Sequence, residues 1–284
     1  MRIAVLGATG QVGSCIVEQL KDDYPKGTII ACSRTSKSGY FLFNPWMDNW
    51  TVLGNIDVLI NCIGIIEETK TFSFEKVHEG ITNAMIQNRS AIGNPRIIQI
   101  SANGADSNSP YPYHASKGRA DEALLNEGNT YVIKPSVICT SGAAMVKQLR
   151  KSRTISRILL NTMPFPKANF KIRLQPVLDS DLAELVSELC AVDSAPRTII
   201  AVGNDIITVR QLLRLLNRYM LVIPVSKKLF DQLFKILGPI LKSVITKTQY
   251  ELLSNDNVGD PKPMEEILGR QVKGTIGFWK EEFR

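Results

Sequence analysis

A glycine-rich turn near the N-terminus restricts the fold of this chain more than any other feature. The apolar run RIAVLG leads into GATGQVG, in which Gly7, Gly10 and Gly13 recur at every third residue. The following residues, QVGSCIVEQL, carry apolar side chains at helical spacing. In such a strand–turn–helix, the first glycine permits a tight turn, the second lets the backbone approach a pyrophosphate, and the third lets helix and strand pack closely. Because a helix N-terminus also attracts phosphate, the turn predicts a dinucleotide-binding site.

Strand-like and helix-like segments alternate through the first half of the chain. The expected strands are continuous apolar runs, as in parallel sheets that are covered by helices on both faces. They are 28–33, 40–43, 56–64, 96–101 and 130–138, and the main helices between them are 74–87 and 113–125. This order predicts an α/β chain with a Rossmann-type doubly wound parallel sheet and a smaller C-terminal α-rich lobe. We expect residues 1–139 with 176–203 to form the NAD(P)-binding domain, and 140–175 with 204–284 to form a small substrate or partner lobe.

Two capping patterns mark helices in the second half of the chain. Asp181 stands three residues before Glu184, and Thr208 stands three residues before Gln211. In a capping box the two side chains satisfy each other's backbone N–H groups at a helix N-terminus. Both pairs therefore predict a helix start.

The residues after the second expected strand bear on the choice of dinucleotide. NAD-binding folds usually place an acid there, which holds the ribose 2′-hydroxyl. Here the strand ends ACSRTSK, with Ser33, Arg34 and Lys37 but no acid. A guanidinium matches the charge and geometry of a 2′-phosphate. The sequence thus favours NADP(H) over NAD(H), unless Arg34 is only a solvated loop residue.

Tyr113 stands four residues before Lys117 on an expected helix, so the two side chains share one helix face. Chance placement can also produce such a pair, and its setting gives it weight: Ser101 ends the preceding strand. In a reductase, Tyr113 would donate a proton to a substrate carbonyl, and Lys117 would hold the cofactor ribose and lower the tyrosine pKa. Ser101 would hydrogen-bond the same carbonyl oxygen.

Composition excludes several other classes of protein. The five cysteines are scattered without close pairs, which argues against a zinc site or a disulfide framework and favours a cytoplasmic protein. His78 and His114 have no metal partners at ligand spacing, so we expect no metal. No apolar run is long enough to span a bilayer, and the N-terminus does not have the pattern of a signal peptide.

Positive charge is concentrated in the second half of the chain. Residues 1–145 carry a net charge of −1 and residues 146–284 a net charge of +8. Residues 227–247 also have the pattern of a basic amphipathic helix. Its apolar stripe is Leu229, Phe230, Leu233, Phe234, Leu237, Ile240 and Leu241, and its basic edge is Lys227, Lys228, Lys235, Lys242 and Lys247. The stripe either closes the core of the small lobe or contacts a partner, which would be an anionic membrane surface or a larger complex. If the partner is a membrane, the protein would lie peripherally on its inner face. No nucleic-acid-binding motif accompanies the charge.

Several blocks, in this order, resemble the atypical short-chain dehydrogenases/reductases. They are GATGQVG, INCIG, QISANGAD, SPYPYHASKGRADEALL, IKPSVI, IRLQPVLDSDLAELV and TKTQYELLSNDNV. The most similar subgroup contains the NADPH-binding accessory subunit of respiratory complex I and its bacterial relatives. The resemblance implies cofactor contacts at Gly7, Thr9, Gly10, Gln11, Val12, Ser33, Arg34, Asn44, Cys62, Ile63, Gly64, Tyr113, Lys117, Pro135, Ser136 and Val137. Catalytic roles are implied for Tyr113, Lys117 and Ser101.

Two functions are consistent with these residues. One is an NADP(H)-dependent oxidoreductase that reduces a small-molecule carbonyl, for example a quinone- or lipid-related one, with Tyr113 as acid and Lys117 as its activator. The other is a non-catalytic NADPH-binding subunit or assembly factor of a respiratory or membrane complex. A sugar-nucleotide epimerase, which usually holds NAD tightly, is disfavoured by Arg34.

Overall fold

A computed structural model describes residues 1–140, 162–216, 221–236 and 247–283. The described residues form two compact units. The first unit contains Met1–Pro135, Asp179–Val202 and Asp260–Val272. The second unit contains the described residues of Ser136–Leu178, Gly203–Gly259 and Lys273–Arg284.

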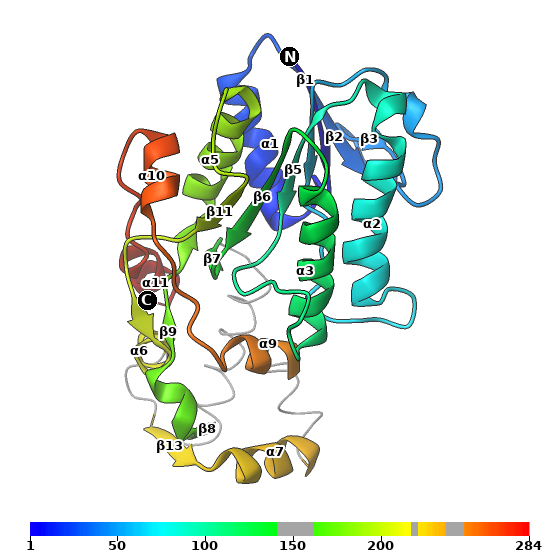
Figure 1. The fold of residues 1–284 in the computed structure, drawn as a ribbon. Helices are drawn as coiled ribbons and strands as arrows, with labels where there is room; N and C mark the ends of the chain where they lie inside the picture. Colours follow the sequence, from blue (N-terminus) through cyan, green and yellow to red (C-terminus); the bar gives the residue numbers. More distant parts are fainter. Residues whose placement is uncertain (141–161, 217–220, 237–246, 284) are drawn as a thin grey trace. The chain divides into compact units, whose positions relative to one another are not determined.

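A seven-stranded parallel sheet forms the centre of the first unit (Figure 1). Its strand order is β11-β6-β5-β4-β1-β2-β3. The strands are β1 (Arg2–Leu6), β2 (Thr28–Ser33), β3 (Phe41–Leu42), β4 (Val58–Asn61), β5 (Arg96–Ile100), β6 (Thr130–Pro135) and β11 (Thr198–Ala201). β1 pairs in parallel with both β2 and β4, so that Val5 faces Ala31 on one side and Ile60 on the other. The predicted doubly wound α/β fold is confirmed.

Five helices flank this sheet: α1 (Gln11–Asp23), α2 (Phe74–Asn88), α3 (Pro112–Leu125), α5 (Asp179–Ala191) and α10 (Lys262–Leu268). From β1 the chain adds β2 and β3 on one side of the sheet and β4, β5 and β6 on the other. Because the crossovers between parallel strands are right-handed, α1 lies on one face of the sheet and α2 and α3 lie on the other. In agreement, α1 packs against α5, and α2 packs against α3 (Figure 1). The core between sheet and helices is mostly apolar, with Leu59, Ile81, Met85, Ile97 and Leu124 buried in it.

Short strands and helices make up the second unit. β7 (Ile138–Cys139) pairs with β10 (Val177–Leu178), β9 (Arg173–Leu174) with β12 (Ile207–Thr208), and β8 (Thr162–Pro166) with β13 (Leu221–Val225). The helices are α6 (Val209–Leu216), α7 (Lys227–Ile236), α9 (Lys247–Leu252) and α11 (Ile276–Glu282), with the 3₁₀ helix η3 (Lys167–Lys171). Trp279, Phe165 and Leu174 lie at the centre of its own hydrophobic core.

One of the two predicted capping boxes is present. The Thr208 amide donates to Gln211 Oε1 over 2.7 Å, and the Gln211 amide donates to Thr208 Oγ1 over 3.2 Å, at the start of α6. The prediction for Asp181 and Glu184 is wrong. α5 already begins at Asp179, and both of the predicted side chains instead form ion pairs with Arg270. The two carboxylates therefore pair with Arg270, which is distant in the sequence, and do not form a local cap.

Only part of the predicted amphipathic helix is described. Phe230 is buried against Tyr250, whereas Leu229 is 46 % exposed. Residues 237–246 of this pattern lie outside the described residues, as do residues 141–161 of the chain. Within the described part of the chain, no helix is both long and apolar enough to cross a membrane.

Candidate functional site

The glycine-rich turn lies between β1 and α1, and its geometry excludes side chains. Gly7 has a φ of +74°, a left-handed conformation that favours glycine. A Cβ atom at Gly13 would lie 2.3 Å from the Gly7 carbonyl oxygen. Gly10 is the N-cap of α1, and no side chain caps the helix there. The turn therefore presents bare backbone at a helix N-terminus, as the approach of a pyrophosphate requires.

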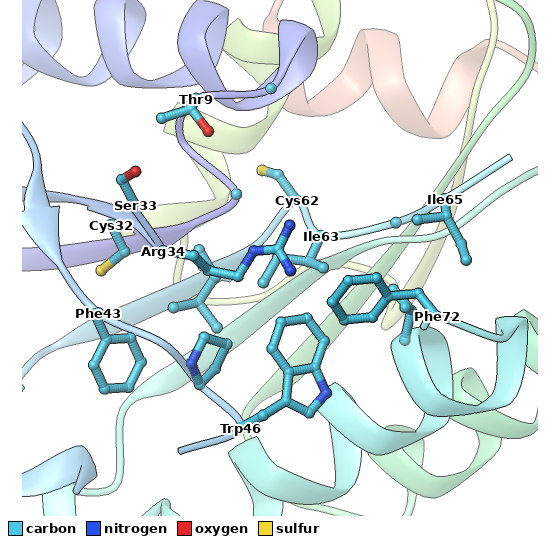
Figure 2. Close-up of a pocket in the computed structure, with 16 residues that line it drawn as sticks. Thr9, Cys32, Ser33, Arg34, Phe43, Trp46, Cys62, Ile63, Ile65 and Phe72 are labelled. Carbon is cyan, nitrogen blue, oxygen red and sulfur yellow. The ribbon is translucent and has the colours of Figure 1, made fainter. Parts of the chain in front are cut away.

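A pocket of about 220 Å³ opens beside this turn (Figure 2). Its walls come from the carboxyl ends of β1, β2 and β4 and from the loops after β3 and before α2. The lining residues are Leu6, Gly7, Thr9, Gly10, Cys32, Ser33, Arg34, Phe43, Pro45, Trp46, Cys62, Ile63, Gly64, Ile65, Phe72 and Val77. Ligands of open α/β sheets bind at this edge.

Eight of the residues predicted to bind the cofactor line this pocket. They are Gly7, Thr9, Gly10, Ser33, Arg34, Cys62, Ile63 and Gly64. Gln11 and Val12 are the first two residues of α1, and their contacts with a cofactor stay predictions. Asn44 holds a turn: its Oδ1 accepts the Trp46 amide over 3.1 Å. The Ser33 hydroxyl donates to the Thr35 carbonyl over 2.7 Å, which fixes the start of the loop that carries Arg34.

The Arg34 guanidinium reaches over the pocket beside two aromatic rings that pack against each other (Figure 2). Its Cζ lies 5.4 Å from the Trp46 ring centroid and 5.0 Å from that of Phe72. Sequence reasoning missed both rings. Trp46 follows β3 and Phe72 precedes α2, so each stands in a loop at the carboxyl edge of the sheet. That position was the one signal that could have identified them.

α3 carries three polar side chains at intervals of four residues: Tyr113, Lys117 and Asp121. The Tyr113 ring packs edge-on against Phe74 and His78 of α2, with centroids 5.6 and 5.5 Å away. Burial raises the pKa of Tyr113 well above its ordinary value, and the negative charge of Asp121 adds to the rise. The expected lowering of this pKa by Lys117 is not seen. Tyr113 therefore keeps its proton at neutral pH.

Lys117 is buried, with its Nζ atom 5.9 Å from the centroid of the Tyr113 ring. The ammonium group donates to the Ile100 carbonyl over 3.2 Å. Burial lowers the pKa of Lys117 to about 8, against the opposing influence of Asp121 and Cys62. A Cβ atom at Gly64 would lie 3.6 Å from Nζ. The ammonium thus faces the loop after β4 that forms one wall of the pocket.

Ser101 differs from its expected role. Its hydroxyl donates to Asp121 Oδ2 over 2.7 Å and is therefore directed to a buried carboxylate. The same carboxylate accepts Gln99 Nε2 over 3.0 Å and lies 3.3 Å from Lys134 Nζ. The proton that Ser101 was expected to offer a substrate carbonyl is used inside the protein.

The side chains of His78 and His114 are both buried, and burial lowers the pKa of each. Burial lowers the pKa of His78 to about 3, so its ring is neutral. Its Nε2 accepts the Ile65 amide over 3.4 Å, so Nδ1 carries the hydrogen that is shared with Ser116 Oγ at 2.8 Å. This bridge ties the pocket loop to α2 and α3. Burial also lowers the pKa of His114. Among the described residues, no group of histidine, cysteine, aspartate and glutamate side chains could hold a metal.

The residues predicted at the nicotinamide end are divided between the two units. Pro135 ends β6 in the first unit, whereas Ser136 and Val137 begin the second. The Ser136 hydroxyl donates to the Asn257 carbonyl over 3.2 Å, and Val137 packs against the core of the second unit. Their contacts with a cofactor stay predictions.

No protein-family model and no curated sequence matches the chain. Solved structures do match it over nearly its full length. A nucleoside-diphosphate-sugar epimerase from Staphylococcus aureus has 14 % identity and a TM-score of 0.70, with 99 % of this chain and 100 % of the other covered. A UDP-glucuronic acid 4-epimerase from Bacillus cereus, in complex with UDP-glucuronic acid and NAD, has 10 % identity, a TM-score of 0.72 and coverages of 100 % and 98 %.

The enzyme RMD from Pseudomonas aeruginosa, complexed with NADPH, has 15 % identity and a TM-score of 0.64, with coverages of 99 % and 97 %. These neighbours include proteins solved with NAD and with NADPH, and at such identities the likeness shows the fold. The subgroup of the complex I subunit stays a prediction. The chain has the fold expected from its resemblance to the short-chain dehydrogenases/reductases, a fold that it shares with these two epimerases and with RMD.

Proposed function

We propose that the first unit binds NADP(H) and that the protein is an oxidoreductase that reduces a carbonyl compound. The observation that carries the proposal is Arg34, whose guanidinium reaches into the pocket beyond the end of β2. An NAD-binding fold usually has a carboxylate at this position. Here a cation stands where a 2′-phosphate would lie, and guanidinium suits phosphate in charge and geometry.

The backbone of the pocket fits a dinucleotide. Gly10 leaves room for a pyrophosphate to approach the N-terminus of α1, and Gly13 lets α1 pack closely on the turn, since a Cβ atom there would lie 2.3 Å from the Gly7 carbonyl oxygen. The pyrophosphate would lie on this turn, and Arg34 would hold the 2′-phosphate. Lys117, next to Gly64 in the pocket wall, would hold the ribose on the nicotinamide side.

The side chains of α3 support proton donation. Bound NADPH would supply hydride to the substrate carbonyl. Tyr113 would supply the proton from its hydroxyl, which is protonated at neutral pH. The charge of Lys117 would stabilise the phenolate that remains after transfer.

Loss of NADPH absorbance in a panel of aldehydes, ketones and quinones tests the catalytic proposal. We expect turnover with at least one class of carbonyl, and a decrease of at least about 100-fold in kcat for Tyr113→Phe, which removes the acid without removing the ring. Tyr111→Phe, a substitution on the neighbouring tyrosine, is the matched control and should leave turnover unchanged. Equal turnover in wild type and Tyr113→Phe would exclude Tyr113 as the acid.

A second function is favoured by one specific observation. The Ser101 proton is directed to Asp121, so the carbonyl-binding donor expected of an active reductase is occupied. The protein would then bind NADPH without rapid turnover, as a subunit or assembly factor of a larger complex. Tight NADPH binding, no turnover with any carbonyl and co-purification with a membrane complex would together support this alternative.

A further inference from the structure

The aromatic rings beside Arg34 give the pocket a feature that the sequence did not predict. We propose that Trp46 and Phe72 form an aromatic support on one side of the Arg34 guanidinium and thereby set the preference for NADP(H) over NAD(H). This inference rests on the proposed NADP(H) site and adds two positioning residues to it. The three side chains come from three different loops and meet over one pocket (Figure 2).

The contacts of Arg34 are the first step of the argument. Its Cζ lies 5.4 Å from the Trp46 centroid and 5.0 Å from the Phe72 centroid, and the two ring centroids are 5.6 Å apart. Within the described part of the chain, the Arg34 guanidinium contacts these two rings, forms no ion pair with a carboxylate and makes no hydrogen bond. A guanidinium whose contacts are with aromatic rings keeps N–H donors available for a ligand.

Available edge donors suit a phosphate. Two parallel N–H groups of a guanidinium can bind two phosphate oxygens at once, and this geometry depends on the orientation of the guanidinium plane. Arginine side chains otherwise lose rotamer freedom when they bind a ligand. Contact with both rings before the ligand arrives restricts Arg34 and removes part of that cost, and affinity for the 2′-phosphate rises accordingly.

Each ring is itself held by its loop. The Trp46 amide donates to Asn44 Oδ1 over 3.1 Å, and the Asn44 amide donates to Asp48 Oδ2 over 2.7 Å. The Trp46 indole donates to the Lys76 carbonyl at the start of α2 over 3.4 Å. On the other side, the Phe72 amide donates to Thr69 Oγ1 over 3.1 Å. The aromatic support is therefore fixed to two turns, and Asn44 contributes by shaping one of them.

A different role for the rings makes a different prediction. If Trp46 and Phe72 stacked on the adenine, their loss would weaken NADPH and NADH equally, because both contain adenine. If they act through Arg34, their loss weakens the ligands with a 2′-phosphate alone. Their effect must then also disappear when Arg34 is removed.

Calorimetric titration separates these outcomes, and it does not depend on the fluorescence of Trp46. The ligands are NADPH, NADH and the fragment pair adenosine 2′,5′-bisphosphate and 5′-AMP. The variants are Trp46→Leu and Phe72→Leu, each with and without Arg34→Ala, together with the conservative variants Trp46→Phe and Phe72→Tyr. Tyr40→Leu is the matched control, because Tyr40 lies 4.5 Å from Lys37 Nζ in the same kind of contact but does not line the pocket.

We expect Trp46→Leu and Phe72→Leu each to weaken NADPH and the bisphosphate about two- to fivefold, the value of one exposed cation–π contact. NADH and 5′-AMP should bind unchanged, the aromatic replacements should restore affinity, and Tyr40→Leu should have no effect. Equal weakening of NADPH and NADH, or persistence of the effect in Arg34→Ala, would overturn the role of the aromatic support. An NADPH preference that needs Arg34 but neither ring would overturn that role alone, whereas a wild-type protein that binds no dinucleotide would overturn the proposed function with it.

Discussion

The Ser101 hydroxyl donates to Asp121 Oδ2 over 2.7 Å, from the end of β5 to the third turn of α3. Asp121 is 1 % exposed and also receives Gln99 Nε2 and the charge of Lys134. The carboxylate thus joins the strand ends β5 and β6 to the helix that carries Tyr113 and Lys117. It fixes the geometry of the candidate active site while it withdraws the Ser101 proton from that site.

Replacing Asp121 should destabilise the protein strongly. Asp121→Ala leaves the Lys134 ammonium without its carboxylate, and losing one partner of a buried pair costs about 3–5 kcal/mol. Urea unfolding at neutral pH measures the loss. Lys134→Met combined with Asp121→Ala should recover part of it, since the uncompensated charge is gone. Equal destabilisation in the single and double variants would show that the ion pair contributes nothing.

Removing the charge of Lys117 should stabilise the protein in the absence of ligand. The folded pKa, about 8, lies below the unfolded value of 10.5, so the unfolded chain binds more protons between these pH values. Wild-type stability therefore rises with pH across this window, and the penalty is fully present at pH 7. Lys117→Met should unfold at higher urea concentration at pH 7, by about 1–3 kcal/mol, with a difference that shrinks toward pH 10.5. A less stable Lys117→Met protein at pH 7 would contradict the buried charge.

The pH dependence of reduction should report Lys117 rather than Tyr113. The pKa of Tyr113 is raised, so its proton remains in place well above neutral pH, whereas Lys117 loses its charge near pH 8. We expect kcat/KM to fall as pH rises through about 8, because the group that holds the ribose becomes neutral. Lys117→Arg, which stays charged, should lack this decline. A decline near pH 8 that persists in Lys117→Arg would assign it to another group.

A methyl group in the glycine turn should abolish dinucleotide binding. In Gly13→Ala the new Cβ would lie 2.3 Å from the Gly7 carbonyl oxygen, so the turn and the start of α1 must separate. Calorimetry with NADPH measures the effect. Gly128→Ala is the matched control, since a Cβ there meets nothing within 4 Å. Unchanged affinity in Gly13→Ala would place the phosphates elsewhere.

The sequence predicted the fold well because the fold depends on patterns that are local. Continuous apolar strands, the helices between them and a turn that needs three glycines are all visible in short windows. The same windows located Arg34 and the Tyr113–Lys117 pair. They failed at Asp181, where a distant arginine replaced the local cap.

The features of the site that the sequence did not predict depend on contacts between residues that are distant in the chain. Trp46 and Phe72 stand 26 residues apart and meet Arg34 only when two loops fold over the pocket. Ser101 and Asp121 are 20 residues apart, and nothing in either segment indicates that the serine donates inward. The pKa of Tyr113 depends on burial, which a tyrosine–lysine spacing does not specify.

The central claim is that Arg34 makes the pocket an NADP(H) site. Its most direct test is calorimetric titration of wild type and Arg34→Ala with NADPH and with NADH. We predict that wild type binds NADPH at least about tenfold more tightly than NADH, a difference of about 1.4 kcal/mol, and that Arg34→Ala removes the difference by weakening NADPH alone. Tighter binding of NADH by wild type, or an NADPH preference that survives in Arg34→Ala, would contradict the claim.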